Sequence, residues 1–105
     1  MSNLLINEPP LQVLPSLAKA IGLNEAIVLQ QLHYWISNPK VGKEHGGMRW
    51  VYNSVREWQE DNFPFWSEAT IRRTLASLRE KGIVFAENLN RAEYDRTLWY
   101  TINYE

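Results

Sequence analysis

Apolar residues near the start of the chain fall into a short run followed by a helical pattern. The run at residues 4–6 is closed by two prolines, so residues 1–10 are expected to form an extended or flexible arm. Helical spacing then predicts a helix over residues 11–21, with Gly22 as its stop. Because Pro15 fits a helix only near its first turn, this helix can begin as late as that residue.

A second helical pattern follows at once. It predicts a helix over residues 25–37, with Asn24 as the N-cap, Glu25 in the first turn, and Asn38-Pro39 as the end. One stripe of apolar side chains is expected to be buried, consisting of Val28, Leu29, Leu32, Trp35 and Ile36.

Extended and helical patterns then alternate. Residues 40–47 are polar and glycine-rich and predict a loop, whereas β-favouring residues predict a strand over 48–52. Asn53 is the expected cap of a short helix carrying Val55 and Trp58. The segment Phe63-Pro64-Phe65-Trp66 ends that helix, because a proline disfavours helical backbone at the residue before it.

The next helix is the best bounded in the sequence. It runs from Ser67, its N-cap, to Lys81, with Gly82 at the C′ position. Its inward face carries Ile71, Leu75 and Leu78.

Two predicted strands complete the chain, one over residues 83–86 and one over residues 96–104. Residues 88–95 between them are polar and turn-rich, so the two strands predict a β-hairpin with a long tip. In the second strand Leu98, Tyr100 and Ile102 face one side, and Thr97, Trp99 and Thr101 the other. The order of elements predicts an α+β, mainly α, winged helix-turn-helix in a single domain over residues 1–105.

Composition and charge narrow the function classes. The 105 residues carry a net charge of −1, so nucleic-acid binding would need a local patch rather than a polycation. The absence of cysteine excludes disulfides, thiolate metal sites and a cysteine nucleophile. The sequence has neither a basic leader nor a run of about 20 apolar residues, which predicts a soluble, cytoplasmic protein without membrane contact.

Positive charge is concentrated on the helix from Ser67 to Lys81, which carries +2 while the remaining chain carries −3. A helix-turn-helix inserts this helix into the major groove of DNA. The predicted DNA-binding residues of the helix are Ser67, Thr70, Arg72, Arg73 and Ser77, and those of the hairpin are Arg91 and Arg96. Glu80, Glu93 and Asp95 oppose phosphate, so weak or partner-assisted binding is expected.

Simpler roles remain open for these residues. The arginines can form a solvated helix face, with Arg79 and Lys81 complementing the helix C-terminus. The five tryptophans could stack on unpaired bases, but core packing explains them better, and Trp66 is the ring expected to be half exposed. His33 and His45 have no partner at metal-ligand spacing.

No catalytic motif is present, neither a phosphate-binding glycine loop nor a nucleophile elbow nor a carboxylate pair in an apolar setting. The sequence therefore predicts a protein that is not an enzyme and that uses no cofactor or metal.

Several motifs between residues 25 and 104 together carry a family resemblance. They are Leu32-His33-Tyr34-Trp35-Ile36, Trp50-Val51-Tyr52-Asn53, Trp58-Gln59, Phe63-Pro64-Phe65-Trp66-Ser67-Glu68, Thr70-Ile71-Arg72-Arg73, Leu78, and Arg96-Thr97-Leu98-Trp99-Tyr100-Thr101-Ile102. The chain resembles the N-terminal winged-helix domain of phage and prophage replication proteins, which is similar to replisome organisers and DnaD-like primosome proteins of Gram-positive bacteria.

The resemblance implies binding of origin DNA, or self-association, during the initiation of phage replication. A further region for single-stranded DNA or helicase-loader contacts usually follows in such proteins. The chain is accordingly expected to be an excised domain or a short stand-alone relative.

Three functions remain open at this point. The first is a domain that binds double-stranded DNA without catalysis. The second is an interaction module of a replication complex, in which residues 4–6 and the helix over 11–21 pair protomers or contact replication proteins. The third is a transcriptional regulator, because the same fold serves that role.

Overall fold

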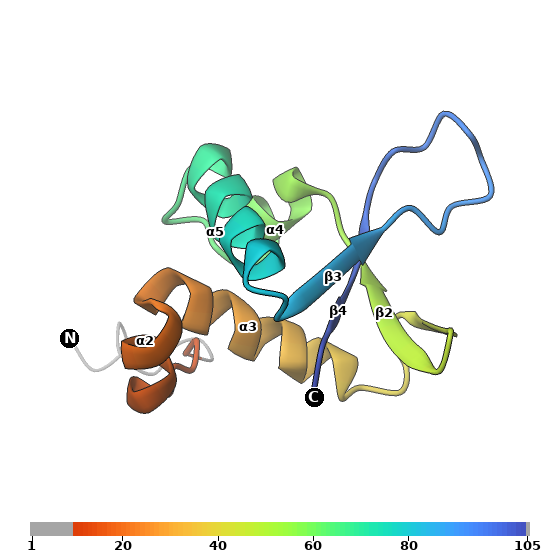
Figure 1. The fold of residues 1–105 in the computed structure, drawn as a ribbon. Coiled ribbons are helices and arrows are strands. Elements are labelled where there is room, and N and C mark those ends of the chain that lie inside the picture. The colour runs from red at the N-terminus through yellow and green to blue at the C-terminus, as the bar shows by residue number, and fades with distance from the viewer. Residues whose placement is uncertain (1–9, 105) are drawn as a thin grey trace.

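Four helices and a small antiparallel sheet of four strands make up residues 10–104, the part of the chain that the computed structural model describes (Figure 1). This part is α+β and mainly helical, and it is compatible with the predicted winged helix-turn-helix. The helices are α2 (Pro15–Ile21), α3 (Leu23–Ile36), α4 (Val55–Asp61) and α5 (Glu68–Glu80). The strands are β1 (Lys43–His45), β2 (Met48–Tyr52), β3 (Val84–Glu87) and β4 (Trp99–Ile102). Most of the predicted N-terminal arm lies outside the described residues.

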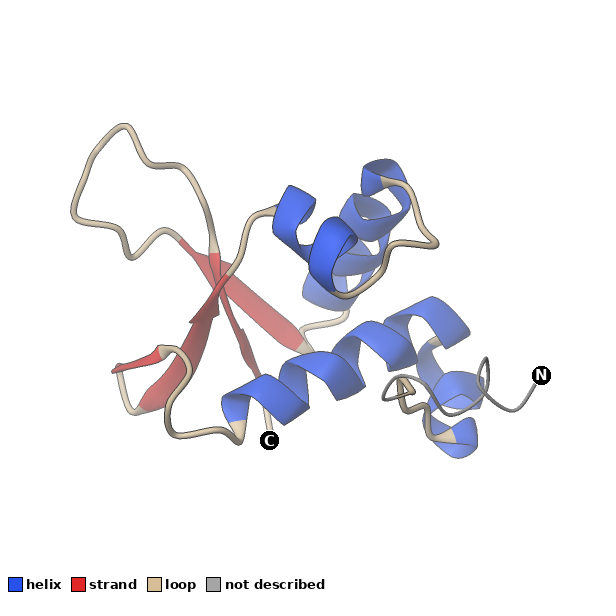
Figure 2. Ribbon diagram, turned by 180° about the vertical axis from the view of Figure 1, so that it is seen from behind, coloured by secondary structure: helices blue, strands red, loops and turns tan. Residues whose placement is uncertain are grey.

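The helices gather at one end of the molecule and the sheet at the other (Figure 2). Helix α3 joins the two ends, since it contacts α2, α5, β2 and β4. Helix α2, in contrast, packs against α3 with no fully buried side chain, and its Ile21 is partly buried against the core. Helix α3 therefore supports α4, α5 and the sheet along its length.

The junction of α2 and α3 corrects one prediction. Helix α2 begins at Pro15, as that residue allows, and ends at Gly22. Gly22 is also the N-cap of α3, so Asn24 lies inside the helix and the predicted Asn24 cap is wrong. Gly22 has φ +110°, a conformation open to glycine, and it lets the chain turn between two helices with no linker.

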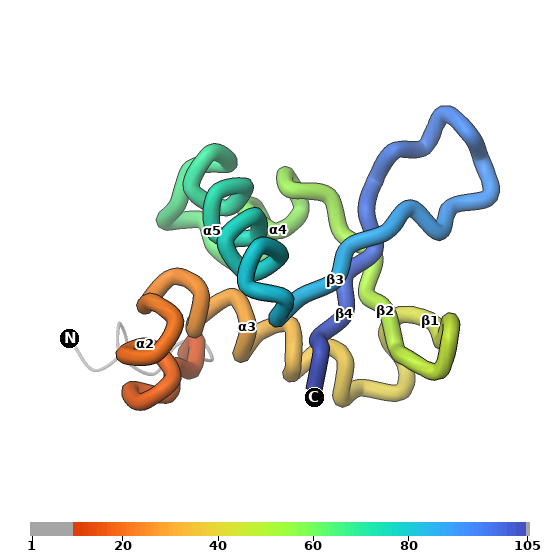
Figure 3. The backbone as a smooth tube through the Cα atoms, in the orientation of Figure 1, coloured from red at the N-terminus to blue at the C-terminus, as the bar shows by residue number. Residues whose placement is uncertain are grey.

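The segment predicted as a loop over residues 40–47 contains a strand. β1 pairs antiparallel with β2, with His45 opposite Met48 (Figure 3). Gly46 and Gly47 connect them, and both have positive φ, as a two-residue type I′ hairpin turn requires. The polarity of this segment reflects exposed strand residues, because all three side chains of β1 face solvent.

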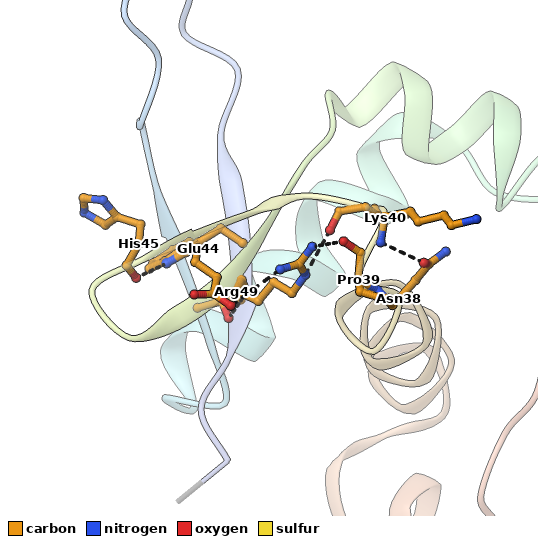
Figure 4. Close-up of polar contacts among 9 residues, drawn as sticks. Asn38, Pro39, Lys40, Glu44, His45 and Arg49 are labelled. Carbon is orange, nitrogen blue, oxygen red and sulfur yellow. Dashed lines mark hydrogen bonds and ion pairs between the residues drawn. The ribbon is translucent and has the colours of Figure 1, made fainter.

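Arg49 of β2 fixes the chain that leads into this hairpin (Figure 4). Its Nε donates to the carbonyl oxygen of Val41 at 3.1 Å, and Nη2 donates to the carbonyl oxygen of Pro39. Its Nη1 lies 3.8 Å from Oε1 of Glu44. One side chain thus ties β2 both to β1 and to the loop after α3.

Helix α4 begins one residue later than predicted. Its cap is Ser54 rather than Asn53, because Ser54 and Glu57 form a reciprocal capping box, with the Glu57 amide donating to Ser54 Oγ at 3.1 Å and the Ser54 amide donating to Glu57 Oε1 at 3.0 Å. Asn53 is instead buried. Helix α5 has the predicted caps, Ser67 before it and Gly82 after Lys81.

The sheet has the strand order β1-β2-β4-β3, so the last strand lies between two earlier ones. β4 covers only part of the predicted strand over 96–104, because pairing stops where Trp99 meets Glu87. Because β4 is central, both of its edges are paired. Its side chains are buried on both faces, and Thr101 is as buried as Tyr100 and Ile102. The hydroxyl of Thr101 donates to the carbonyl oxygen of Arg49 at 2.6 Å.

Aromatic rings occupy the centre of the core. Trp58 and Phe63 are fully buried and stack in parallel, with ring centroids 5.8 Å apart. Trp35 also stacks with Trp58, at 5.3 Å, and Tyr100 meets Trp58 edge-on at 6.1 Å. The expected core role is therefore met by Trp35 and Trp58, and Trp66 is partly buried against the same cluster.

Candidate nucleic-acid interface

Helix α5 presents one face to the core and the opposite face to solvent. Ile71, Thr74, Leu75 and Leu78 are buried. At about 100° per residue, the centre of the outer face carries Ala69, Arg73, Ala76 and Glu80. This strip combines small side chains with one cation and one anion, so the helix backbone can approach a partner closely.

The five predicted recognition residues do not form one cluster. Ser67 and Thr70 bond to each other through their hydroxyl oxygens at 3.1 Å, and the Thr70 amide donates to Ser67 Oγ at 3.2 Å. Ser77 accepts from Lys81 Nζ at 2.6 Å. Thr70 and Arg72 lie about 160° apart around the helix, so they face different partners.

Arg72 and Arg73 differ in their environment. The Nη2 of Arg72 lies 3.0 Å from Oε1 of Glu68, one turn earlier, in an exposed ion pair. The Nη2 of Arg73 donates to Thr70 Oγ1 at 3.1 Å, a neutral partner. Among the described residues Arg73 therefore forms no ion pair, and of the two its charge is the one available to an anion.

The loop between β3 and β4, residues 88–98, is the predicted wing. It rises from the sheet on the same side of the molecule as α4 and α5 (Figure 1). Asn90 organises it, because its Nδ2 donates to the carbonyl oxygens of Asp95 at 3.0 Å and Thr97 at 2.7 Å. Capture of these carbonyls by a side chain explains why β4 begins only at Trp99.

Asp95, expected to repel phosphate, is held within the wing. Oδ1 accepts from the amide of Thr97 at 3.1 Å, and Oδ2 accepts from the hydroxyl of Tyr52 at 3.1 Å. These donors, the Thr97 amide first, hold the pKa of Asp95 below its usual value. The carboxylate is thus a charged structural group of the loop.

The two predicted wing arginines are exposed, and they differ in surroundings. Arg91 lies in the wing loop, whereas Arg96 lines a groove between the wing, α5 and the start of α4. Neither forms a hydrogen bond or an ion pair within residues 10–104. Both keep their full charge for an external anion.

The groove has a volume of about 640 Å³. Arg56, Arg72 and Arg96 line it together with Glu68 and Asp95. Arg56 pairs with Glu60 at 3.0 Å, and this hydrogen-bonded partner raises the pKa of the guanidinium. Burial raises the pKa of Tyr100, whose hydroxyl-bearing ring also lines the groove.

Sequence reasoning missed two further residues of this groove. Asn53 is 6% exposed, and its Nδ2 has no hydrogen-bond partner within the described part of the chain. Tyr94 is 89% exposed and lines the groove from the wing. Both line the groove because residues far apart in the sequence meet there, which no local pattern encodes.

Neither histidine lies in a candidate metal site, since residues 10–104 hold no group of three or more side chains able to bind a metal ion. His33 instead bonds through Nδ1 to the hydroxyl of Tyr104 at 2.7 Å. Across the same residues, every helix is too short or too polar to span a bilayer.

Comparison with known proteins gives no relative. No family model, no curated protein and no solved structure matches the chain.

Proposed function

We propose that the chain is a non-catalytic winged-helix domain that binds double-stranded DNA, with α5 in the major groove and the wing beside it. The observation that carries the proposal is the arrangement of α5 and the wing. Both face the same side, and they offer Arg73, Arg91 and Arg96 without an ion-pair partner among the described residues. Arginines of this kind bond phosphate or guanine edges.

The biological setting belongs to the same proposal. A role in initiating phage or prophage DNA replication is supported by the sequence resemblance, whose motifs fall on α3, β2, α4, α5 and β4. A transcriptional regulator would use the same surface. Enrichment from a library of random duplexes, compared with origin and promoter fragments, would separate the two roles.

Fluorescence anisotropy with a labelled duplex tests the DNA proposal. At about 50 mM salt the wild type should bind, and at about 200 mM the affinity should fall as phosphate contacts are screened. Arg73→Ala should weaken binding about tenfold, the loss of one good side-chain contact. Lys19→Ala, a cation on the remote helix α2, should leave affinity unchanged. No binding by the folded wild type at the lower salt concentration would overturn the proposal.

A specific observation favours a second candidate function, self-association. Leu14 and Leu23, on either side of α2, are 52% and 57% exposed, and Leu11 and Val13 nearby are exposed as well. Light scattering at tens of micromolar would show a dimer that Leu14→Ser/Leu23→Ser dissociates. Tyr34→Ser, at an equally exposed site on α3, is the control. A monomeric wild type would exclude this function.

A further inference from the structure

The groove beside α5 differs from the rest of the proposed DNA surface because it is concave. Its volume of about 640 Å³ lies within the range of small-molecule sites, about 300–1,000 Å³. A major groove is filled by a convex helix, and the exposed strip of α5 serves that purpose without the groove. A ligand of this groove is therefore expected to be a group that fits a concave surface.

Once the internal ion pairs of the groove are counted, one anion and one cation remain, Asp95 and Arg96. Glu68 is paired with Arg72, and Arg56 with Glu60. Asp95 accepts hydrogen bonds from Tyr52 and Thr97. Arg96 is left as the one groove cation without a carboxylate partner among the described residues, which favours a singly anionic ligand such as a phosphodiester.

An uncharged side chain adds a different requirement. Tyr94 stands two residues before Arg96 and has no ring or hydrogen-bond contact within the described residues, so its face is free to stack on a flat ring. Asn53 also lines the groove, but its Nδ2 is buried below the groove surface and is assigned no contact with the ligand. A flat ring linked to a phosphate describes a nucleotide.

We propose that this groove binds one unpaired nucleotide of a DNA strand, so that the domain prefers a duplex with a single-stranded tail to a blunt duplex. Tyr94 stacks on the base, and Arg96 bonds the phosphate. The inference extends the proposed duplex binding, since the tail would emerge beside α5. Paired bases in a blunt duplex offer no free ring face to Tyr94.

Fluorescence anisotropy with four labelled probes tests the inference. The probes are a blunt duplex, two versions of that duplex with a short thymidine tail on one or the other strand, and the tail sequence alone. The wild type should bind one tailed duplex about fivefold or more tightly than the blunt one, as stacking of one base provides. Tyr94→Ala should lower the affinity for the tailed duplex to that for the blunt duplex, and Tyr94→Phe should retain the preference. Tyr104→Ala, at an exposed tyrosine that follows β4 in the chain, should leave the affinity for every probe unchanged.

A second measurement locates the base directly. Bromodeoxyuridine placed in the tail should crosslink on irradiation to the peptide that contains Tyr94, as mass spectrometry would show. Crosslinks elsewhere would overturn the assignment.

The outcomes separate this inference from the proposed function. Equal affinity for blunt and tailed duplexes would overturn the inference and leave duplex binding intact. Equal weakening of both duplexes by Tyr94→Ala would also overturn it, since Tyr94 would then contact the duplex backbone. Binding of tailed or single-stranded probes that depends on Tyr94, without binding of the blunt duplex, would support the groove and overturn the duplex proposal.

Discussion

The indole nitrogen Nε1 of Trp99 donates a hydrogen bond of 2.7 Å to Oδ1 of Asn90, across the base of the wing. Together with the two bonds that Nδ2 of Asn90 donates to loop carbonyls, this contact satisfies the amide on both sides. Asn90 therefore holds the base of the wing at three points.

Replacement of Asn90 by alanine should lower the free energy of unfolding by about 2 kcal/mol, because three part-buried hydrogen bonds are lost, including those of the Trp99 indole and the Thr97 carbonyl. Urea unfolding monitored by tryptophan fluorescence measures this loss. Asn88→Ala removes two exposed hydrogen bonds, to the Asp95 carbonyl oxygen and from the Asn90 amide, and should cost about 1 kcal/mol or less. Equal losses in the two variants would show that Asn90 has no special part in the wing.

Asn24 provides a test of where α3 begins. Because it lies inside the helix and its side chain has no hydrogen bond within the described residues, Asn24→Ala should raise stability by about 0.5 kcal/mol through helix propensity. An N-cap would behave oppositely and lose about 1 kcal/mol on the same change. The sign of the shift in the urea midpoint therefore decides between Gly22 and Asn24.

Gly42 and Gly82 have similar backbone angles, with φ +77° and +71°, but different surroundings. A methyl group at Gly42 would overlap the backbone oxygen of Trp50, whereas at Gly82 it would meet open space. Gly82→Ala should cost about 1–2 kcal/mol for the left-handed backbone alone. Gly42→Ala should cost clearly more, and thermal unfolding of both variants compares them. Similar costs would mean that the β1–β2 hairpin yields to the added methyl group.

Glu68 is expected to limit DNA binding, because it pairs with Arg72 and places a negative charge near the start of α5. Glu68→Gln should strengthen duplex binding several-fold at about 50 mM salt and less at about 200 mM. Glu44 of β1 is a carboxylate near Arg49 of β2, and Glu44→Gln should have no such effect on DNA binding. Weaker binding by Glu68→Gln would indicate that the ion pair orients Arg72 for its contact.

The pH dependence of stability should include a contribution from Asp95. Its folded pKa lies below the unfolded value of about 3.9, so its stabilisation is present above that pH and is lost as the pH falls through the folded pKa. Asp95→Asn should therefore be less stable than the wild type at neutral pH, and the two should converge in acid. Glu93→Gln, at an exposed wing residue, should parallel the wild type throughout. Urea midpoints of the three proteins, measured from neutral to acid pH, test this prediction.

Local signals in the sequence predict most of the helices. Ser67 and Gly82 bound α5 correctly because capping depends on nearest neighbours. The predicted cap at Asn24 is wrong because Gly22, two residues earlier, has positive φ and caps α3 with its backbone alone. The predicted cap at Asn53 is wrong because Ser54 has a glutamate three residues later and Asn53 does not. This spacing is visible in the sequence.

The strands and the candidate site were less accessible. The Gly46-Gly47 pair indicates a hairpin, but the exposed residues of β1 obscured it. The pairing of Arg72 with Glu68 follows from their spacing of four. The role of Asn90 depends on irregular loop backbone up to nine residues away, and the place of Asn53 depends on wing residues far along the chain. Neither kind of contact has a periodic signature, so one sequence does not predict them.

The position of β4 has a consequence for biosynthesis. Because β4 is inserted between β2 and β3, the β1–β2 hairpin has no partner on its other edge, and β3 has no partner at all, until residues 99–102 have left the ribosome. Until then Trp58 also lacks the ring of Tyr100. The nascent chain is thus expected to stay open, with its aromatic core exposed to chaperones, and to close in a single late step.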